Sequence, residues 1–104
     1  MKLTTKQLIA DNNSKREQLN EDNQKYYEQL IVYIRSQFLV NERQTEEVLT
    51  EMLDHLLLAQ HKGQSAKDVF GRTPKEFADE VLDALPKDRK RSQWLFVLEM
   101  LMML

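Results

Sequence analysis

The sequence has 104 residues, a charged fraction of 31% and a formal net charge of −2, with two glycines, two prolines and no cysteine. This length suits one domain with a single hydrophobic core, and the scarcity of Gly and Pro among Leu, Gln, Glu and Lys favours helices. The lack of cysteine excludes disulfides, thiolate metal ligands and cysteine nucleophiles. We therefore expect an all-α fold, a compact bundle or superhelix of about five to six helices with an apolar C-terminal helix.

The first helix that the sequence predicts is sparsely apolar. Thr4 or Thr5 can accept a hydrogen bond from the first free amides of a helix. The residues that then recur at helical spacing are Leu8, Ile9, Asn12, Arg16 and Leu19. Because few of them are apolar, we expect residues 1–19 to form an N-terminal helical arm that lies on the rest of the domain.

Two longer helices follow. Asn20 can cap the second one, and the acidic residues after it favour the positive end of the helix dipole. Its apolar face comprises Tyr26, Tyr27, Leu30, Ile31, Ile34 and Phe38. Asn41 or Thr45 can start the third helix. Its apolar residues fall on one side at spacings that only a helix gives: Val48, Leu49, Met52, Leu53, Leu56 and Leu57.

Capping patterns indicate two shorter helices. Gly63 supplies the left-handed residue that ends the third helix. Ser65 and Asp68 can bond to each other's backbone amides, which predicts one helical turn closed by Gly71. The fifth helix has a strong start pattern, a hydroxyl followed by proline and by a carboxylate that reaches back: Thr73, Pro74 and Glu76. Its buried face, before Pro86 stops the helix, is predicted to hold Phe77, Val81, Leu82 and Leu85.

Charge divides the chain at residue 87. Residues 1–86 carry 11 basic and 15 acidic residues, whereas residues 87–104 carry four basic and two acidic ones. The basic cluster and the tryptophan that follows it are Lys87, Arg89, Lys90, Arg91 and Trp94. From Trp94 to Leu104 the chain is apolar except for Glu99, too uniformly so for a surface helix. We therefore divide the chain into a helical domain, residues 1–86, and a basic juxtamembrane cluster with the start of an apolar helix, residues 87–104.

The apolar run has two interpretations. At about 1.5 Å per residue it reaches roughly 16 Å, about half of a roughly 30 Å hydrocarbon core. In the first interpretation the sequence stops inside the first transmembrane helix of a longer protein, with Trp94 at the interface and the basic cluster on the cytoplasmic side. In the second, the run docks into this domain, a partner or a second copy of the chain. We favour the first, although Glu99 costs a few kcal/mol inside a membrane.

Patterns for catalysis and metal binding are weak. Glu51 and His55 share a helix face, as two metal ligands would, but two ligands do not close a site. A surface ion pair or a hydrogen bond is the more ordinary interpretation of this pair. The sequence shows neither a Gly-rich phosphate loop nor a Ser-His-acid order. We expect no enzyme activity, no metal and no cofactor.

The third helix also carries acidic residues with no Lys or Arg from residue 45 to residue 60. They predict either a solvated face or a docking face for a basic protein partner: Glu46, Glu47, Glu51 and Asp54.

Residues 65–85 have the outline of a helix-turn-helix, but the second helix carries one Lys against four acidic residues. Phosphate would be repelled by such a surface, so we expect no nucleic-acid partner.

Residues along the third to fifth helices form a pattern of packing and capping positions: Leu53, Asp54, His55, Leu56, Gly63, Ser65, Ala66, Phe70, Gly71, Pro74, Phe77, Ala78 and Leu82. With them the chain resembles the HAAS-type helical signalling domains and related uncharacterised membrane-protein families of Gram-positive bacteria. An upstream stretch is similar to the N-terminal part of one such family: Lys15, Arg16, Leu19, Asn23, Tyr26, Tyr27, Tyr33, Ile34 and Arg35. The resemblance covers about residues 8–86.

The resemblance implies a superhelical all-α cytosolic domain, often placed before several transmembrane helices and often encoded beside PadR-type transcription regulators. It implies no catalytic residues. The chain departs from the membrane members because it ends at Leu104 with Glu99 inside the apolar run. We expect a non-enzymatic regulatory or protein-interaction domain at the cytoplasmic face of the cell membrane. The alternative is a soluble helical adaptor that self-associates, or binds a partner, through residues 94–104.

Overall fold

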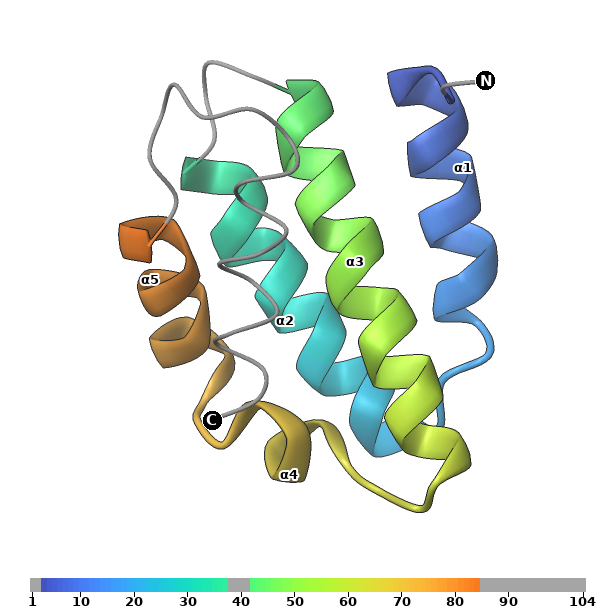
Figure 1. The fold of residues 1–104 in the computed structure, drawn as a ribbon, viewed down its shortest axis with the longest axis vertical. Helices are drawn as coiled ribbons and strands as arrows, with labels where there is room; N and C mark the ends of the chain where they lie inside the picture. Colours follow the sequence, from blue (N-terminus) through green and yellow to red (C-terminus); the bar gives the residue numbers. More distant parts are fainter. Residues whose placement is uncertain (1–2, 38–41, 85–104) are drawn as a thin grey trace.

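The computed structural model describes residues 3–37 and 42–84, and these residues form five α-helices (Figure 1). In chain order they are α1 (Thr5–Arg16), α2 (Glu21–Gln37), α3 (Glu42–His61), α4 (Ala66–Phe70) and α5 (Pro74–Ala84). The prediction of an all-α fold is confirmed. Several predicted features lie outside the described residues: the packing of Phe38 and Leu85, the cap Asn41, the stop at Pro86 and the apolar helix after Trp94.

The helices pack in the order α5, α2, α3, α1, and α4 contacts both central helices, α2 and α3 (Figure 1). α1 and α3 run in the same direction, while α2 and α5 run opposite to them. The bundle therefore has two ends, which we name as Figure 1 is drawn. At the upper end α1 and α3 begin and α2 finishes. At the lower end α2 begins, α3 finishes and α4 lies, while the shorter helices α1 and α5 each cover only part of the length of α3.

One hydrophobic core joins α2, α3, α4 and α5. Its fully buried large side chains are Tyr27, Leu30, Ile34, Val48, Leu49, Met52, Leu53, Leu56, Phe77 and Val81. The apolar stripe predicted for α3 is buried except for Leu57, which is partly buried. At the lower end the rings of Tyr26, Phe70 and Phe77 stack in series, with centroids 5.5 Å and then 4.4 Å apart. Fully burying one Val, Leu, Ile, Phe or Met side chain of this core stabilises the fold by about 1.5–3 kcal/mol.

The helix boundaries follow from the capping residues. Thr4 caps α1, because its hydroxyl accepts from the Gln7 amide at 3.1 Å and the Gln7 side chain accepts from the Thr4 amide at 2.8 Å. Asn20 caps α2 by accepting from the Asn23 amide at 2.9 Å. The predicted caps of α4 and α5 are confirmed by the reciprocal pairs Ser65 with Asp68 and Thr73 with Glu76. Thr45, the alternative start of the third helix, lies inside α3, so that alternative is wrong.

Two glycines end helices in a conformation that other residues adopt at a cost. Gly63, after α3, has φ +79°, and Gly71, after α4, has φ +70°. The Gly71 amide donates to the Lys67 carbonyl at 2.8 Å, and after α3 the Gln64 amide donates to the Ala59 carbonyl at 3.0 Å. These bonds occupy carbonyls that the end of a helix leaves free. Both predicted helix ends are therefore confirmed.

Candidate interaction surface

The acidic residues of α3 begin with a carboxylate that is inside the protein. Glu46 is 3% exposed, and the guanidinium of Arg35 on α2 donates two hydrogen bonds to it, at 2.7 Å and 3.1 Å. The expectation that Glu46 belongs to an exposed docking face is therefore wrong. A buried carboxylate requires a charged partner. Here the partner lies on α2, so the sequence of α3 alone does not reveal that Glu46 is buried.

The next acidic residues of α3 are less buried than Glu46, and two of them form ion pairs within the chain. Glu47 pairs with Arg43 one turn earlier at 3.1 Å. Asp54 accepts from Lys15 of α1 at 2.8 Å. The hydrogen bond with Asp54 raises the pKa of Lys15 above its ordinary value, against the lowering effect of partial burial. Glu51 is half-buried. The surface around these residues is therefore less acidic than the sequence of α3 suggests, and partner binding at Glu47, Glu51 and Asp54 stays a prediction.

A buried polar link connects α1 to the two central helices. The Asn12 amide group donates to the hydroxyl of Tyr27, and that hydroxyl donates to the Leu49 carbonyl at 3.0 Å. Burial raises the pKa of Tyr27, so its hydroxyl stays protonated and remains a donor. Among the described residues, the Asn12 Oδ1 and the Thr50 hydroxyl are buried without a hydrogen-bond partner. α1 is thus held mainly by polar contacts, since Leu8 is its one buried apolar side chain.

A second polar cluster fixes the lower end. The Gln60 side chain accepts from the Asn20 amide at 2.8 Å and from the Asn23 side chain at 3.1 Å, and it donates to the Gln18 carbonyl at 3.0 Å. Asn23 in turn accepts from the Ala66 amide, the first of α4, at 2.7 Å. Motif reasoning did not assign this role to Asn23 and Gln60. One feature of the sequence could have indicated this role for Asn23. It stands one turn before Tyr27, at a position where the apolar stripe of α2 would place an apolar residue.

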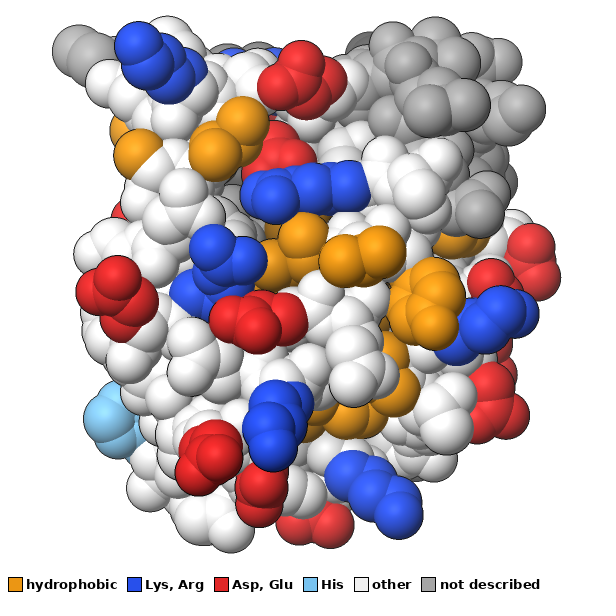
Figure 2. All heavy atoms as spheres, turned by 180° about the vertical axis from the view of Figure 1, so that it is seen from behind, with side chains coloured by type: hydrophobic (Ala, Val, Ile, Leu, Met, Phe, Trp, Pro, Cys, Tyr) orange, Lys and Arg blue, Asp and Glu red, His pale blue; other side chains and the backbone are white. Residues whose placement is uncertain are grey.

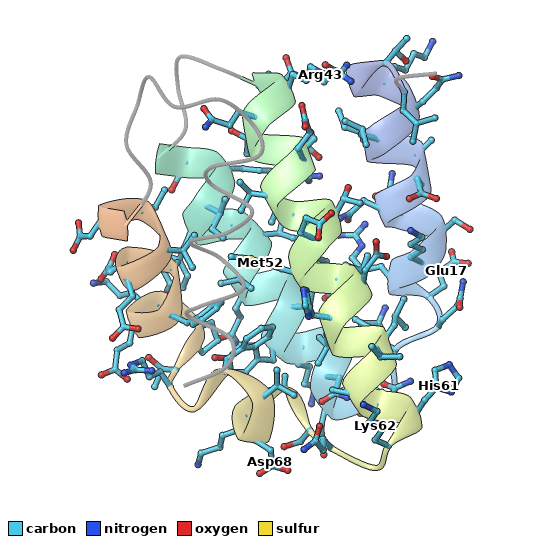
Figure 3. The ribbon with its side chains drawn as sticks, viewed as in Figure 1. Glu17, Arg43, Met52, His61, Lys62 and Asp68 are labelled. Atoms are coloured by element: carbon cyan, nitrogen blue, oxygen red, sulfur yellow. The ribbon has the colours of Figure 1, made fainter. Side chains whose placement is uncertain are left out.

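His55 lies beside a hollow of about 290 Å³ between the end of α3 and α4, lined also by Leu58, Ala59, Lys62 and Asp68. Figure 3 shows His61, Lys62 and Asp68 at the lower end of the bundle and Arg43 at the upper end. Within residues 3–37 and 42–84, no three or more His, Asp or Glu side chains are grouped so that they could hold a metal ion. The hollow therefore presents mixed polar and apolar side chains rather than a ligand set.

The predicted membrane-contacting residues, Lys87, Arg89, Lys90, Arg91 and Trp94, lie outside the described residues, as does the proposed contact between copies through Trp94 to Leu104. In the part of the chain that the structure describes, no helix has both the length and the apolar composition needed to cross a membrane.

Taken together, the fold defines a small all-α domain in which two ion pairs, Lys15 with Asp54 and Arg35 with Glu46, join different helices. A family model described as a protein of unknown function (DUF1129) matches residues 18–104, and the chain belongs to that family. The matched range includes α2 to α5 and the basic and apolar segment, whereas α1 precedes it. No curated protein and no solved structure matches the chain significantly. The resemblance to HAAS-type domains and their PadR-type neighbours stays a prediction.

Proposed function

We propose that this chain is a non-catalytic, membrane-proximal domain at the cytoplasmic face of the cell membrane, with a regulatory or protein-interaction role. The observation that carries the proposal is the order of features after α5. Ala84 ends that helix, Lys87 opens the basic cluster three residues later, and Trp94 opens the apolar run. A basic cluster followed by an interfacial aromatic and an apolar segment is the arrangement found on the cytoplasmic side of membrane anchors.

The charges of the bundle support this assignment of the membrane contact to residues 87–104. Residues 1–86 carry a net charge of −4, which an anionic lipid surface repels, whereas residues 87–104 carry +2. The basic residues Lys15 and Arg35 are held in ion pairs with Asp54 and Glu46. Electrostatic attraction to anionic lipid therefore has its source in the segment after α5. The HAAS-type resemblance supports a signalling role for the bundle and adds a PadR-type regulator to the candidate partners.

Vesicle flotation tests the proposal. The chain is compared with a variant in which Lys87, Arg89, Lys90 and Arg91 are all changed to Gln, on neutral and on anionic vesicles. We expect the unchanged chain to float preferentially with anionic vesicles and the variant to lose most of that preference, because each basic residue near the surface contributes about 1 kcal/mol. A matched control changes four exposed lysines of the bundle to Gln, Lys25, Lys62, Lys67 and Lys75, which alters the net charge equally.

The outcomes separate the two functions that the sequence allows. Loss of flotation in the first variant alone supports the membrane-proximal domain. Equal loss in both variants would show that net charge, and not the segment after α5, determines binding. If the unchanged chain binds neither kind of vesicle but self-associates in solution, and Trp94→Glu abolishes that association, the soluble adaptor is the better description.

A further inference from the structure

α1 contacts the rest of the bundle through one narrow face. The residues that carry this contact, Leu8, Asn12 and Lys15, follow one another at helical spacing and so share one side of α1. Leu8 and Asn12 are buried, and Lys15 forms an ion pair with Asp54 of α3. Seen from behind, the side of the molecule where α1 lies shows mainly polar and charged side chains, and most visible hydrophobic side chains are nearer the middle (Figure 2). α1 is therefore an amphipathic helix whose binding face points inward.

The face of α3 that α1 covers is acidic. Asp54 binds Lys15, and Glu46, two turns earlier, lines a hollow of about 290 Å³ together with Ile9 of α1. Thr50 stands four residues from each of these acidic residues, so the three lie along one line of the helix. α1 itself carries three basic residues and one acidic residue. α1 and the face formed by Glu46, Thr50 and Asp54 are therefore complementary in charge.

The fit between α1 and this face is imperfect. The Asn12 Oδ1 and the Thr50 hydroxyl are buried without a hydrogen-bond partner within the chain, which weakens a contact. The ion pair to Asp54 joins side chains that are 30% and 46% exposed, and such pairs contribute little. An apolar residue in place of Asn12 would remove one unpaired atom, and the Tyr27 hydroxyl would keep its bond to the Leu49 carbonyl. A different helix could therefore bind this face more strongly than α1 does.

The chain that follows α1 is fixed to the bundle independently of α1. Leu19 is buried in the hydrophobic core, and the Gln60 side chain bonds to the Gln18 carbonyl and to the Asn20 amide. Glu17, at the end of α1, directly precedes this fixed segment (Figure 3). The family model also matches from residue 18 onward. α1 can therefore leave α3 by a change at one junction, while α2 to α5 keep their shared core.

We propose that α1 is a displaceable cover over a docking face on α3, formed by Glu46, Thr50 and Asp54. The partner that this face receives is an amphipathic helix with apolar residues at the positions of Leu8 and Asn12 and a basic residue seven positions after the first. α1 occupies the face as a substitute within the chain, so the partner's apparent affinity is reduced by the fraction of molecules in which the face is open. This inference rests on the protein-interaction role in the proposed function, for which it names a site and a partner, and it does not depend on the membrane contact.

A synthetic peptide with the sequence of α1 and the change Asn12→Leu is the probe. It is labelled with a fluorophore, and its binding to full-length chains is measured by fluorescence anisotropy. The opened variant carries Leu8→Asp and Lys15→Glu, whereas the matched control carries Leu3→Asp and Lys6→Glu, the same changes at exposed positions. We expect the opened variant to bind the peptide at least about 10-fold more tightly than the unchanged chain, because the face is free in a larger fraction of molecules. The control should bind the peptide like the unchanged chain.

A charge comparison shows whether the peptide lies where α1 lay. A peptide that also carries Lys15→Gln should bind the opened variant about 2- to 5-fold more weakly, since it lacks the ion pair. Adding Asp54→Asn to the opened variant should remove this difference between the two peptides, because both changes then act on the same contact. A difference that persists would place the peptide elsewhere and overturn the proposal.

The unchanged chain provides a test that needs no opened variant. Excess unlabelled peptide is added to the ¹⁵N-labelled chain, and amide hydrogen exchange is followed by NMR. We expect the amides of α1 to lose protection and those of α3 to keep it. Undiminished protection of α1 at saturating peptide would overturn the proposal, as would equal binding of the peptide to all three chains, or no binding to an opened variant that circular dichroism shows to be folded. A chain that floats with anionic vesicles but fails these tests keeps its membrane-proximal function and loses only the docking face.

Discussion

Glu46 is a buried carboxylate that accepts two hydrogen bonds from an arginine of the neighbouring helix. Removing the arginine leaves the carboxylate buried without its counter-charge, which is costly in a low-dielectric interior. Arg35 is about one third exposed, so water can partly replace it. We expect Arg35→Ala to lower the free energy of unfolding by about 2 kcal/mol, measured by urea denaturation.

Arg43→Ala is the matched control, because Arg43 has the same side-chain exposure and also pairs with a glutamate. That glutamate, Glu47, is 12% exposed and lies one turn away on the same helix, so the loss should stay below about 1 kcal/mol. A double change of Arg35 to Met and Glu46 to Leu should recover most of the stability lost in Arg35→Ala. Equal losses in the two single variants would show that the deeper burial of Glu46 does not make its ion pair the more important of the two.

At the scale of elements, α1 is the helix least integrated into the bundle. It buries Leu8 and Asn12, and the hydrophobic core cluster of the described residues draws its members from Leu19 onward. Native-state hydrogen exchange should therefore show α1 opening at a lower free energy than α3. Leu8→Ala should reduce the protection of α1 amides by about 1–3 kcal/mol and leave α2 and α3 unchanged. The exposed Leu3, changed to Ala, is the control; a similar loss of protection in α3 would contradict separate opening of α1.

The caps of α4 and α5 predict a pH dependence. Hydrogen bonds with Ser65 lower the pKa of Asp68 below its ordinary value of 3.8, and hydrogen bonds with Thr73 lower the pKa of Glu76 below 4.5. A carboxyl whose pKa is lower in the folded state contributes stability above its ordinary pKa, and this contribution is lost as the pH falls through the folded value. The urea concentration at the midpoint of unfolding should therefore decrease as the pH is lowered from about 5 to about 3.

The double variant with Asp68→Asn and Glu76→Gln should show a smaller decrease in the urea midpoint over this pH range. The reason is that the amides that replace the two carboxyl groups do not titrate. Thr73→Ala should also flatten the profile, because the hydroxyl that contributes most to lowering the pKa of Glu76 is gone. An undiminished slope in both variants would assign the acid sensitivity to other carboxyl groups.

For the molecule as a whole, the sequence predicted what depends on local physics. Helix periodicity identified the buried stripe of α3, and capping residues set the starts of α2, α4 and α5, because both act within a few residues. Contacts between helices were less predictable. Glu46 is buried against Arg35, which belongs to another helix. The Gln60 side chain forms hydrogen bonds with Gln18, Asn20 and Asn23, about 40 residues earlier in the sequence. Periodicity contains no information on which polar faces meet, so the sequence of α3 could not show that Glu46 is buried against Arg35.

The shared core of α2 to α5 leads to a prediction about cooperativity. Met52 lies at the middle of α3, fully buried, in the cluster to which α2, α4 and α5 also contribute (Figure 3). Met52→Ala removes buried volume from this common core, and we expect a loss of about 2–5 kcal/mol in the free energy of unfolding. Helical circular dichroism and tyrosine fluorescence should shift together, since the helices share one core.

Leu58→Ala is the control for that variant, because Leu58 is a large apolar residue on the same helix but is mostly exposed. Its change should alter stability by no more than about 0.5 kcal/mol. The informative failure would be a Met52→Ala variant in which the two probes separate. Tyr26 contacts Phe70 of α4, and the Tyr26 hydroxyl donates to the Arg72 carbonyl just before α5, so a tyrosine transition that precedes the loss of helix would show α4 and α5 unfolding as a unit of their own. A single transition would instead show that the stacked rings of Tyr26, Phe70 and Phe77 join the two short helices to the α2–α3 pair strongly enough for one cooperative fold.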